Sequence, residues 1–349
     1  MRRRRFLAGL GATGLAASAG CLGFLETEPA NREPPLPENR PEEPYYPTHY
    51  EGMEMAGTSA NGRYRAMLSY TFPHRFWTVT GEETERVDVA SSDDAHLMVS
   101  VWDDEAGVAL PASSPRIEFT NPDGETRAFA PWQMLSQRMG IHYGDNVELG
   151  PDGDYEATVQ VSPGGTRRTD DVSTPDGPLE FSFSFSFPFS RGRLNDLAYT
   201  DVAGDREGTP GAVDPMGMGA VAAGQTPTVG SFPLDVRGAQ TAKGAEFVVA
   251  TADQRGSLAT GDDETYVAVS TRSRHSRFPL AAATLSLDAG GDTHQLVPTI
   301  DPELGYHYAA AVSGLGDGDA LTVRQDAACQ LSRHEGYETA FFGVEPMEF

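Results

Sequence analysis

Residues 181–187 read FSFSFSF, with phenylalanine and serine alternating at every position. Side chains that alternate with a period of two lie on opposite faces of an extended strand, whereas a helix would scatter the four rings around its circumference. The stretch therefore predicts a β-strand with one buried aromatic face.

Short β-type runs bounded by turn residues recur along the rest of the chain. The 349 residues include 38 glycines and 25 prolines, which punctuate these runs. No amphipathic helix of normal length is evident, so we predict an all-β fold of the sandwich class. The further predicted strands are 64–70, 97–102, 116–120, 147–149 and 155–161.

An internal repeat divides the chain into two related parts. GIHY at residues 140–143 is echoed by GYHY at residues 305–308, and this pair is one of seven matching anchors that occur in the same order. We therefore predict two tandem immunoglobulin-like β-sandwich domains, at 51–190 and 241–349. The segment 191–240, rich in Gly, Pro, Ala and Asp, is predicted to be a linker.

The first 21 residues are predicted to be a twin-arginine lipoprotein signal. Four arginines at residues 2–5 precede an apolar run that is too short to span a bilayer as a stable helix. The run ends in SAGC, which is typical of a lipobox, so Cys21 is expected to be acylated. The Pro/Glu-rich segment 22–50 then reads as a solvated tether. This pattern predicts a lipid-anchored protein on the extracytoplasmic face of the cell membrane; the alternative is a cytosolic protein with a chance basic start.

The charge of the chain is strongly acidic. The formal net charge is −25, and Lys243 is the single lysine among 26 basic residues. An acidic surface with arginine in place of lysine suits a halophilic archaeon, in which high salt screens the repulsion, although a GC-rich genome alone also gives acidic proteins. Such a chain repels phosphates, so nucleic acid is not an expected partner.

Four side chains of metal-ligating type fall on predicted strands of the first domain. His96 and Met98 are two positions apart on a strand, so their side chains share a face. Met134 and His142 bracket a loop long enough to fold both residues back onto that face. Two imidazoles and two thioethers suit Cu(I), and also a late divalent metal if a carboxylate or water completes the coordination.

The residues after His142 are suited to support it. Asp145 or Asn146 can orient His142 through its second ring nitrogen. The alternative reading of the four residues is ordinary packing, because methionine commonly fills gaps in a core.

The repeat helps to separate these readings. At the positions that match His96 and Met98, the second copy carries Tyr266 and Ala268. An alanine does not keep the bulk that packing would require, so the comparison favours metal ligands in the first copy. His307 is followed by a tyrosine as His142 is, so part of the His-Tyr motif is predicted to be structural in both copies.

Other candidates carry a weaker signal. His74 lies in the aromatic run PHRFW at residues 73–77, and Met53 and Met55 form a second group of soft ligands at the start of the first domain. These three residues are secondary ligand candidates. Three histidines in polar, turn-rich surroundings are expected at the surface: His275, His294 and His334.

The motifs of the first domain resemble those of the periplasmic iron-transport proteins that act with high-affinity iron permeases. The resemblance rests on His96-Leu97-Met98, on Met134 and on HYGDN at residues 142–146, and it covers roughly residues 51–165. The chain looks closer still to haloarchaeal lipoproteins of this kind. The family implies an immunoglobulin-like sandwich, often dimeric, that binds copper and supports iron uptake.

The resemblance also implies roles for individual residues. His96, Met134 and His142 fall on metal ligands of the family, and Met98 falls where the family has a ligating glutamate. The loss of that carboxylate weakens the case for iron and strengthens the case for Cu(I).

The leading hypothesis is therefore an extracytoplasmic lipoprotein that binds copper, iron or both and supports iron uptake through a membrane permease, without being an enzyme. Two alternatives stay open at this point. One is a metal-free cell-surface interaction module in which the His and Met residues are core, and the other is a copper-dependent protein that changes the redox state of iron.

Overall fold

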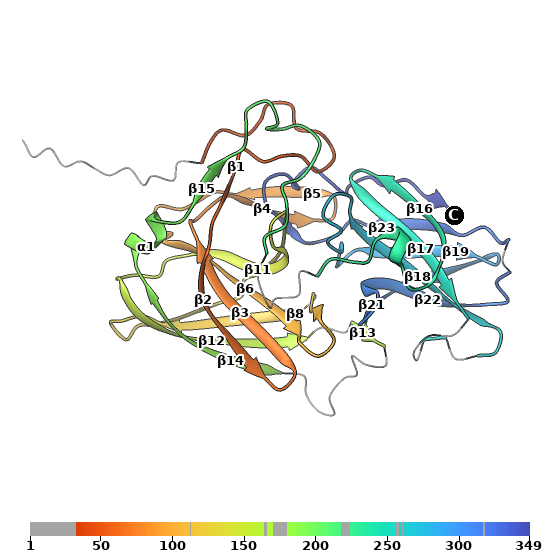
Figure 1. The fold of residues 1–349 in the computed structure, drawn as a ribbon, viewed down its shortest axis with the longest axis horizontal. Coiled ribbons are helices and arrows are strands. Elements are labelled where there is room, and N and C mark those ends of the chain that lie inside the picture. Colours follow the sequence, from red (N-terminus) through yellow and green to blue (C-terminus); the bar gives the residue numbers. More distant parts are fainter. Residues whose placement is uncertain are drawn as a thin grey trace, which may run out of the picture. The chain divides into compact units, whose positions relative to one another are not determined.

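The computed structural model describes residues 33–349, except for 112, 164–165, 170–179, 218–223, 254, 256–257, 260 and 317. The predicted signal and Cys21 lie outside the described residues. Strands make up nearly all of the regular structure, in several sheets (Figure 1), so the prediction of an all-β sandwich fold is confirmed. Among the described residues, no helix is long and apolar enough to cross a membrane.

A nine-stranded sheet carries most of the residues predicted to bind metal. Its strand order is β2-β3-β6-β11-β10-β24-β4-β5, with β7 paired to β6. Its strands are β2 (Glu54–Asn61), β3 (Tyr64–Thr71), β4 (Phe76–Thr80), β5 (Glu83–Val87), β6 (Ala95–Asp103), β7 (Val108–Ala109), β10 (Trp132–Ser136), β11 (Gly140–Val147) and β24 (Ser332–Arg333).

The FSFSFSF stretch forms the strand that was expected. It belongs to β14, in the four-stranded sheet β14-β12-β8-β9, and its rings pack against the inner face of the nine-stranded sheet. Phe183, Phe185 and Phe187 are buried, while the intervening serines are exposed. Burying each such ring stabilises the fold by about 1.5–3 kcal/mol. The strands are β8 (Ser113–Thr120), β9 (Thr126–Phe129), β12 (Gly153–Pro163) and β14 (Phe181–Phe189).

Two further sheets form the core of the C-terminal part. Their strand orders are β13-β21-β22-β18-β17-β16 and β20-β19-β23-β25, and buried side chains of both sheets belong to the same core cluster. The strands are β13 (Arg167–Arg168), β16 (Asp235–Ala242), β17 (Ala245–Ala252), β18 (Glu264–Ser273), β19 (Thr284–Ala289), β20 (Asp292–Gln295), β21 (Val297–Asp301), β22 (Gly305–Ser313), β23 (Thr322–Ala327) and β25 (Met347–Glu348).

Two very short strands cross between the N-terminal and C-terminal parts. β24 lies between β10 and β4 in the nine-stranded sheet, where Ser332 pairs in parallel with Met134 and Arg333 pairs with Trp77. In the opposite direction, β13 pairs in parallel with β21. The insertion of β24 brings a C-terminal segment onto the sheet that carries the predicted ligands.

The segments expected to be tether and linker are folded over the described range. Tyr45 and Thr48 are buried, although 22–50 was expected to be solvated. β1 and β15 pair as a two-stranded sheet, drawn above β11 in Figure 1. Within the expected linker, β16 already begins at Asp235. The short elements here are β1 (His49–Glu51), α1 (Arg191–Asn195), β15 (Tyr199–Asp201) and the 3₁₀ helix η2 (Val229–Ser231).

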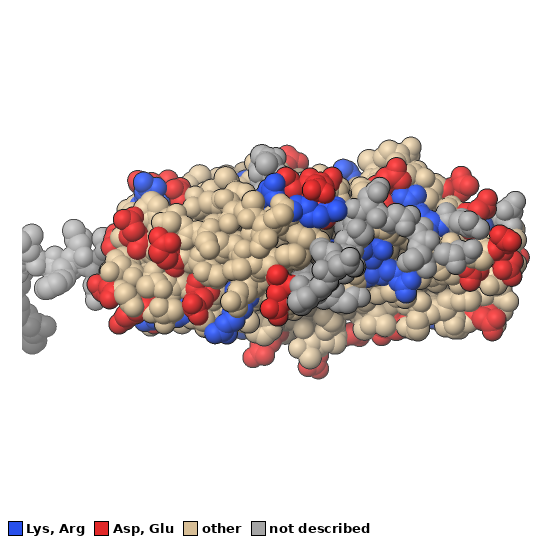
Figure 2. All heavy atoms as spheres, turned by 90° about the horizontal axis from the view of Figure 1, so that it is seen from below, with Lys and Arg blue, Asp and Glu red and all other residues tan. Residues whose placement is uncertain are grey.

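The surface carries the acidic character of the sequence. Figure 2 shows Asp and Glu side chains distributed over one face, with arginines between them. Ion pairs on this protein are formed almost entirely by arginine, because the sequence holds one lysine, which pairs with Glu42.

Candidate metal centre

Four histidine side chains converge on the outer face of the nine-stranded sheet. His96 and His142 lie on the adjacent strands β6 and β11, His74 lies just before β4, and His334 follows β24. The nitrogen atoms that His74, His96 and His334 offer as ligands lie within 4.8 Å of one another. His142 joins this group because its Nε2 is 3.1 Å from Nε2 of His334.

Hydrogen bonds fix the protonation of three of the rings. His142 Nδ1 lies 3.1 Å from the Gly140 carbonyl oxygen, and His74 Nδ1 lies 3.0 Å from the Phe72 carbonyl oxygen. A carbonyl oxygen can only accept, so each Nδ1 donates its proton, and each Nε2 keeps a free lone pair. Both Nε2 atoms face His334: His74 Nε2 is 3.1 Å from Nδ1 of His334, and His142 Nε2 is 3.1 Å from Nε2 of His334.

Asn146 fixes the third ring. The Asn146 amide donates to the His74 carbonyl oxygen at 2.9 Å and accepts from the His74 backbone N–H at 3.3 Å, which settles the orientation of the amide. Its Oδ1 therefore accepts from His96 Nδ1 at 2.9 Å. His96 Nε2 is left buried and without a hydrogen-bond partner.

This arrangement corrects the expected roles of two residues. Asn146 orients His96 rather than His142, whose ring is held by its own strand through Gly140. Asp145 is three positions from His142 on β11, so its side chain points to the opposite face of the strand. Its carboxylate accepts from the Asn146 backbone N–H. Partial burial raises the pKa of Asp145 to about 6.

Met134 belongs to the same centre. It is fully buried on β10, directly opposite His142. Gly144 makes room for it, because a Cβ atom at Gly144 would lie 2.5 Å from His96 Nε2 and 3.3 Å from Met134 Sδ. The sulfur and the unpartnered nitrogen thus lie around one small space that exists because residue 144 has no side chain.

Met98 and Met53 lie beside this centre, whereas Met55 does not. Met98 pairs with Gly144 across β6 and β11 and is buried. Met53 packs against the methionine cluster that contains Met98. Met55 is 55% exposed and does not line the cavity at the centre, so its candidacy as a ligand is not supported.

The expectation of a surface position for His334 is wrong. Its ring is partly buried and contacts the rings of His74, His96 and His142. No sequence pattern indicates this position, because His334 reaches the site through the two-residue strand β24, from a part of the chain 192 positions beyond His142. The one feature of the sequence that could have marked His334 as a ligand is that it is a histidine.

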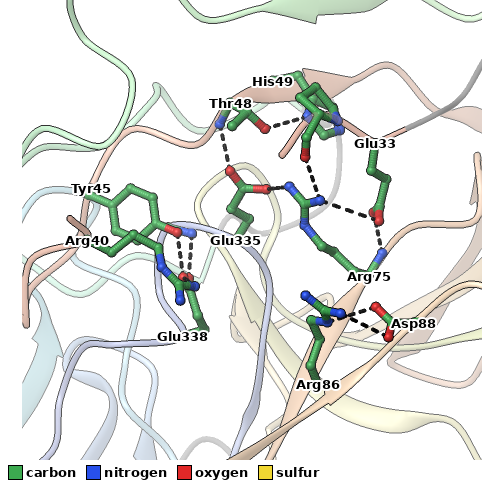
Figure 3. Close-up of polar contacts among 12 residues, drawn as sticks. Glu33, Arg40, Tyr45, Thr48, His49, Arg75, Arg86, Asp88, Glu335 and Glu338 are labelled. Atoms are coloured by element: carbon green, nitrogen blue, oxygen red, sulfur yellow. Dashed lines mark hydrogen bonds and ion pairs between the residues drawn. The ribbon is translucent and has the colours of Figure 1, made fainter. Parts of the chain in front are cut away.

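An ion pair holds the two loop histidines together. Arg75 follows His74 and Glu335 follows His334, and the Arg75 guanidinium pairs with the Glu335 carboxylate, both almost fully buried. Residues 33–53, together with 211–217, contribute the outer lining of the cavity described below and are called the cover. Figure 3 shows Arg75 between Glu335 and Glu33, which belongs to the cover. Removing one partner of a buried pair costs about 3–5 kcal/mol, so this pair fixes the positions of both loops.

The cover is fastened to the chain next to His334. The Thr48 backbone N–H donates to Glu335 at 2.7 Å, and Arg40 pairs with Glu338 at 2.7 Å (Figure 3). A cavity of about 90 Å³ remains between the cover and the centre, which is room for several waters or a partly hydrated cation. Its walls include His74, His334, Met98 and Arg75.

The rings of His96, His142 and His334 are neutral at pH 7. Burial, with the neighbouring His74, lowers the pKa of His96 and of His334 well below the ordinary value. Burial also lowers the pKa of His142 to about 4. Neutral imidazoles with free Nε2 lone pairs are the form in which histidine binds metals.

The second copy shows how the same backbone is completed without a metal ligand set. His307 Nδ1 donates to the Gly305 carbonyl at 3.1 Å, as His142 does to Gly140, but His307 Nε2 contacts the Tyr266 hydroxyl at 2.6 Å. Met134 stands opposite His142, and Thr299 stands opposite His307. The tyrosine hydroxyl therefore satisfies the nitrogen that faces other imidazoles in the first copy.

The tyrosine of the repeated motif is structural in both copies, as predicted. The Tyr143 hydroxyl accepts from the Ser113 N–H at 2.8 Å and donates to the Leu110 carbonyl at 3.1 Å. The Tyr308 hydroxyl makes the matching bonds with the Ala283 N–H and the Leu280 carbonyl, at 2.8 and 2.9 Å.

One protein family matches part of the chain. A family described as "Domain of unknown function (DUF7350)" matches residues 230–349. No curated protein matches the chain in sequence.

Similar solved structures include a copper-bound variant of FetP from uropathogenic Escherichia coli strain F11, with 20% identity and a TM-score of 0.30, covering 39% of this chain and 97% of that chain. They also include copper-reconstituted P19 from Campylobacter jejuni, with 20% identity and a TM-score of 0.32, covering 40% of this chain and 97% of that chain.

Gly144→Ala is expected to close the centre without unfolding the sheet. The new methyl group would collide with His96 Nε2, whereas β22 carries an alanine, Ala309, at the corresponding position opposite Ala268. Metal bound at this centre, measured as the nitrogen-coordinated signal in X-ray absorption of the loaded protein, should fall at least tenfold, with an unchanged circular dichroism spectrum. Ala309→Gly is the matched control and should keep wild-type metal content. Full metal retention by Gly144→Ala would contradict the assignment.

The metal-free protein should lose stability as the pH falls from 6.5 towards 4. Because the folded-state pKa of His142 is lowered from 6.5 to about 4, the unfolded chain takes up a proton first, and stability present above pH 6.5 is lost through this window. This shift alone corresponds to about 3 kcal/mol. Urea unfolding at pH 7 and pH 4.5 measures the loss, and His142→Gln should make the dependence on pH shallower. An equal dependence in both proteins would show that His142 is not buried as a neutral ring.

Proposed function

We propose that this protein binds a transition metal, with copper as the first candidate, at the centre formed by His74, His96, His142, His334 and Met134. The observation that carries the proposal is the convergence of Nε2 lone pairs. His96 Nε2 is buried without a partner. His334 contacts the Nε2 atoms of His74 and His142, and each of these two rings already donates its Nδ1 proton to a backbone carbonyl. A cation on one side of His334 would accept the single lone pair of that ring together with those of neighbouring rings, and the His334 N–H would donate across its other contact.

Four neutral rings cannot satisfy every contact of this cluster by hydrogen bonding alone. His74 and His142 each use their N–H on a backbone carbonyl, so neither can donate to His334. A neutral His334 has one N–H and can therefore donate across one of its two 3.1 Å contacts, leaving two lone pairs opposed in the other. The donor set fits a metal ion in place of the missing protons.

The type of donor favours copper. Imidazole suits copper, zinc, iron and nickel, whereas thioether sulfur suits Cu(I) and is a poor ligand for hard ions. Met134 supplies the thioether, and no described carboxylate belongs to the group of His74, His96 and His334. Iron would prefer an oxygen ligand at this place, so Cu(I) is the better match.

Carriage of the metal fits the centre better than catalysis does. Four imidazoles and a thioether supply more donors than a tetrahedral ion needs, so the protein's own groups can occupy the positions that a substrate would require. We infer that the protein captures copper and passes it on, in support of iron uptake through a membrane permease. The sequence resemblance to iron-transport proteins supports this role.

The test of metal binding compares the protein with its His96→Ala/His142→Ala variant. After loading with Cu(I) under reducing, oxygen-free conditions and desalting, the wild type should retain copper at this centre, and the variant should lose at least nine tenths of it there. X-ray absorption at the copper edge should report nitrogen and sulfur neighbours in the wild type.

His307→Ala is the matched control for that experiment, because His307 holds the place of His142 in the second copy. It should keep the wild-type copper signal even if its stability falls. If the wild type and the double variant retain the same amount of copper with the same X-ray absorption spectrum, the metal centre is overturned and a metal-free interaction module is favoured.

Export and anchoring are separate proposals, supported by the twin-arginine pattern and by the lipobox at Cys21. Cys21→Ser should move the protein from the membrane fraction to the soluble fraction of its cells, because acylation would be lost. Mass spectrometry of the N-terminal peptide should find acyl chains on Cys21 of the wild type only. A membrane-bound Cys21→Ser protein would contradict lipid anchoring at this residue.

A further inference from the structure

The methionines of this chain gather around the metal centre. The sequence contains ten methionines, and six of them lie around one region of the outer face of the nine-stranded sheet. One of the six, Met134, belongs to the histidine centre itself. The other five are Met53, Met67, Met98, Met139 and Met216.

Four of these methionines line the cavity beside the histidines. Met53 and Met216 come from the segments that cover the cavity, while Met98 and Met139 come from the sheet and the turn before β11. Met67 lies behind them, fully buried, in the cluster that Met98 and Met139 form with Trp102. Methionines from the sheet and from the covering segments therefore line one cavity.

Core packing alone would not require methionine at these places, as the second copy shows. Met67 pairs with Ser100, and Val248 pairs with Ser270 at the corresponding position of β17 and β18. Leu304 precedes the glycine of β22 as Met139 precedes the glycine of β11.

These aliphatic counterparts fill the same kind of face. Val248, Ala268 and Leu304 belong to one buried apolar cluster, which Phe232 and Ala259 complete. The face that carries valine, alanine and leucine is thus packed with apolar side chains. The face that carries Met67, Met98 and Met139 adjoins a cavity, and further methionines enter it from the cover.

We propose that Met53, Met98, Met139 and Met216 form a second site, for a soft monovalent cation of the Cu(I) class, next to the histidine centre. The inference rests on the copper binding proposed above and adds a separate site with its own ligands. Thioethers are neutral and polarisable, so they favour Cu(I) over hard cations. The carboxylates that line the same cavity, those of Glu33, Glu51 and Glu335, are already paired with Arg75 or His49. His74 and His334 line the same cavity, so a cation can pass between the two sites.

The position of Met98 supports the exchange. It lies on the same face of β6 as His96 and directly opposite Gly144, which borders the histidine centre. It also lines the cavity with the other three methionines. One side chain therefore borders both sites.

The test counts Cu(I) equivalents in the whole protein. Oxygen-free titration against a chromophoric Cu(I) chelator should give two equivalents for the wild type. A Met53→Leu/Met139→Leu/Met216→Leu variant should give one, because leucine keeps the volume, at a cost below about 1.5 kcal/mol per site, but removes the sulfur. Met55→Leu is the matched control, since Met55 is exposed outside the cavity, and it should give two.

A second variant separates this proposal from the metal centre. His96→Ala/His142→Ala should keep one equivalent, with sulfur as its main neighbour by X-ray absorption. If the wild type binds one equivalent and the leucine variant also binds one, the methionine site is overturned and the histidine centre is retained. Two equivalents in the leucine variant would also overturn it. Two sulfur-bound equivalents in the histidine variant would overturn the histidine centre instead.

Discussion

Four imidazole rings buried against one another impose the constraint on which this site depends. Each neutral ring has one N–H to donate and one lone pair to be satisfied. His74, His96 and His142 direct their N–H groups outwards, to two carbonyls and the Asn146 amide, so their lone pairs point inwards. Burial lowers the pKa of His96 and of His142, which opposes the simplest remedy, protonation of those two rings. A bound cation would accept lone pairs of this cluster, and the His334 N–H would donate across the contact that remains.

The second copy of the motif shows the other solution to the same geometric problem. There the backbone holds His307 as it holds His142, and the Tyr266 hydroxyl contacts the nitrogen that would otherwise be free. A histidine in this position is therefore not by itself evidence for a metal. The evidence is that the first copy surrounds it with imidazoles where the second supplies a hydroxyl group.

The sequence predicted the part of the site that local patterns determine. Alternation identified β14, and the spacing of His96 and Met98 placed them on one face of a strand, as β6 shows. Met134 and His142 were expected to come together on that face, and they stand opposite each other in the register of β10 and β11. These relations depend on the period of a strand and on short connections, both of which can be read from sequence.

The remaining parts depend on long-range pairing that leaves no periodic trace. His334 reaches the centre because Ser332 and Arg333 complete a sheet whose other strands lie far earlier in the chain. A two-residue strand is too short to show alternation. The sequence signal at His74 is weak for a related reason, since the position of His74 is fixed by Asn146 and by the Arg75–Glu335 pair rather than by a strand.

The cover over the centre bears on how a metal would be exchanged. Glu33, Thr48 and the β1 strand close over the cavity, and their anchors, Arg75 and Glu335, are the immediate neighbours of His74 and His334. Loosening the cover would therefore also loosen two of the ligands, so opening and release would be coupled through the same ion pair. In the proposed role as a carrier, such a centre would hold a metal while the cover is closed and release it when the cover is displaced. That coupling is the property a carrier needs, and it follows from the placement of one arginine and one glutamate next to two histidines.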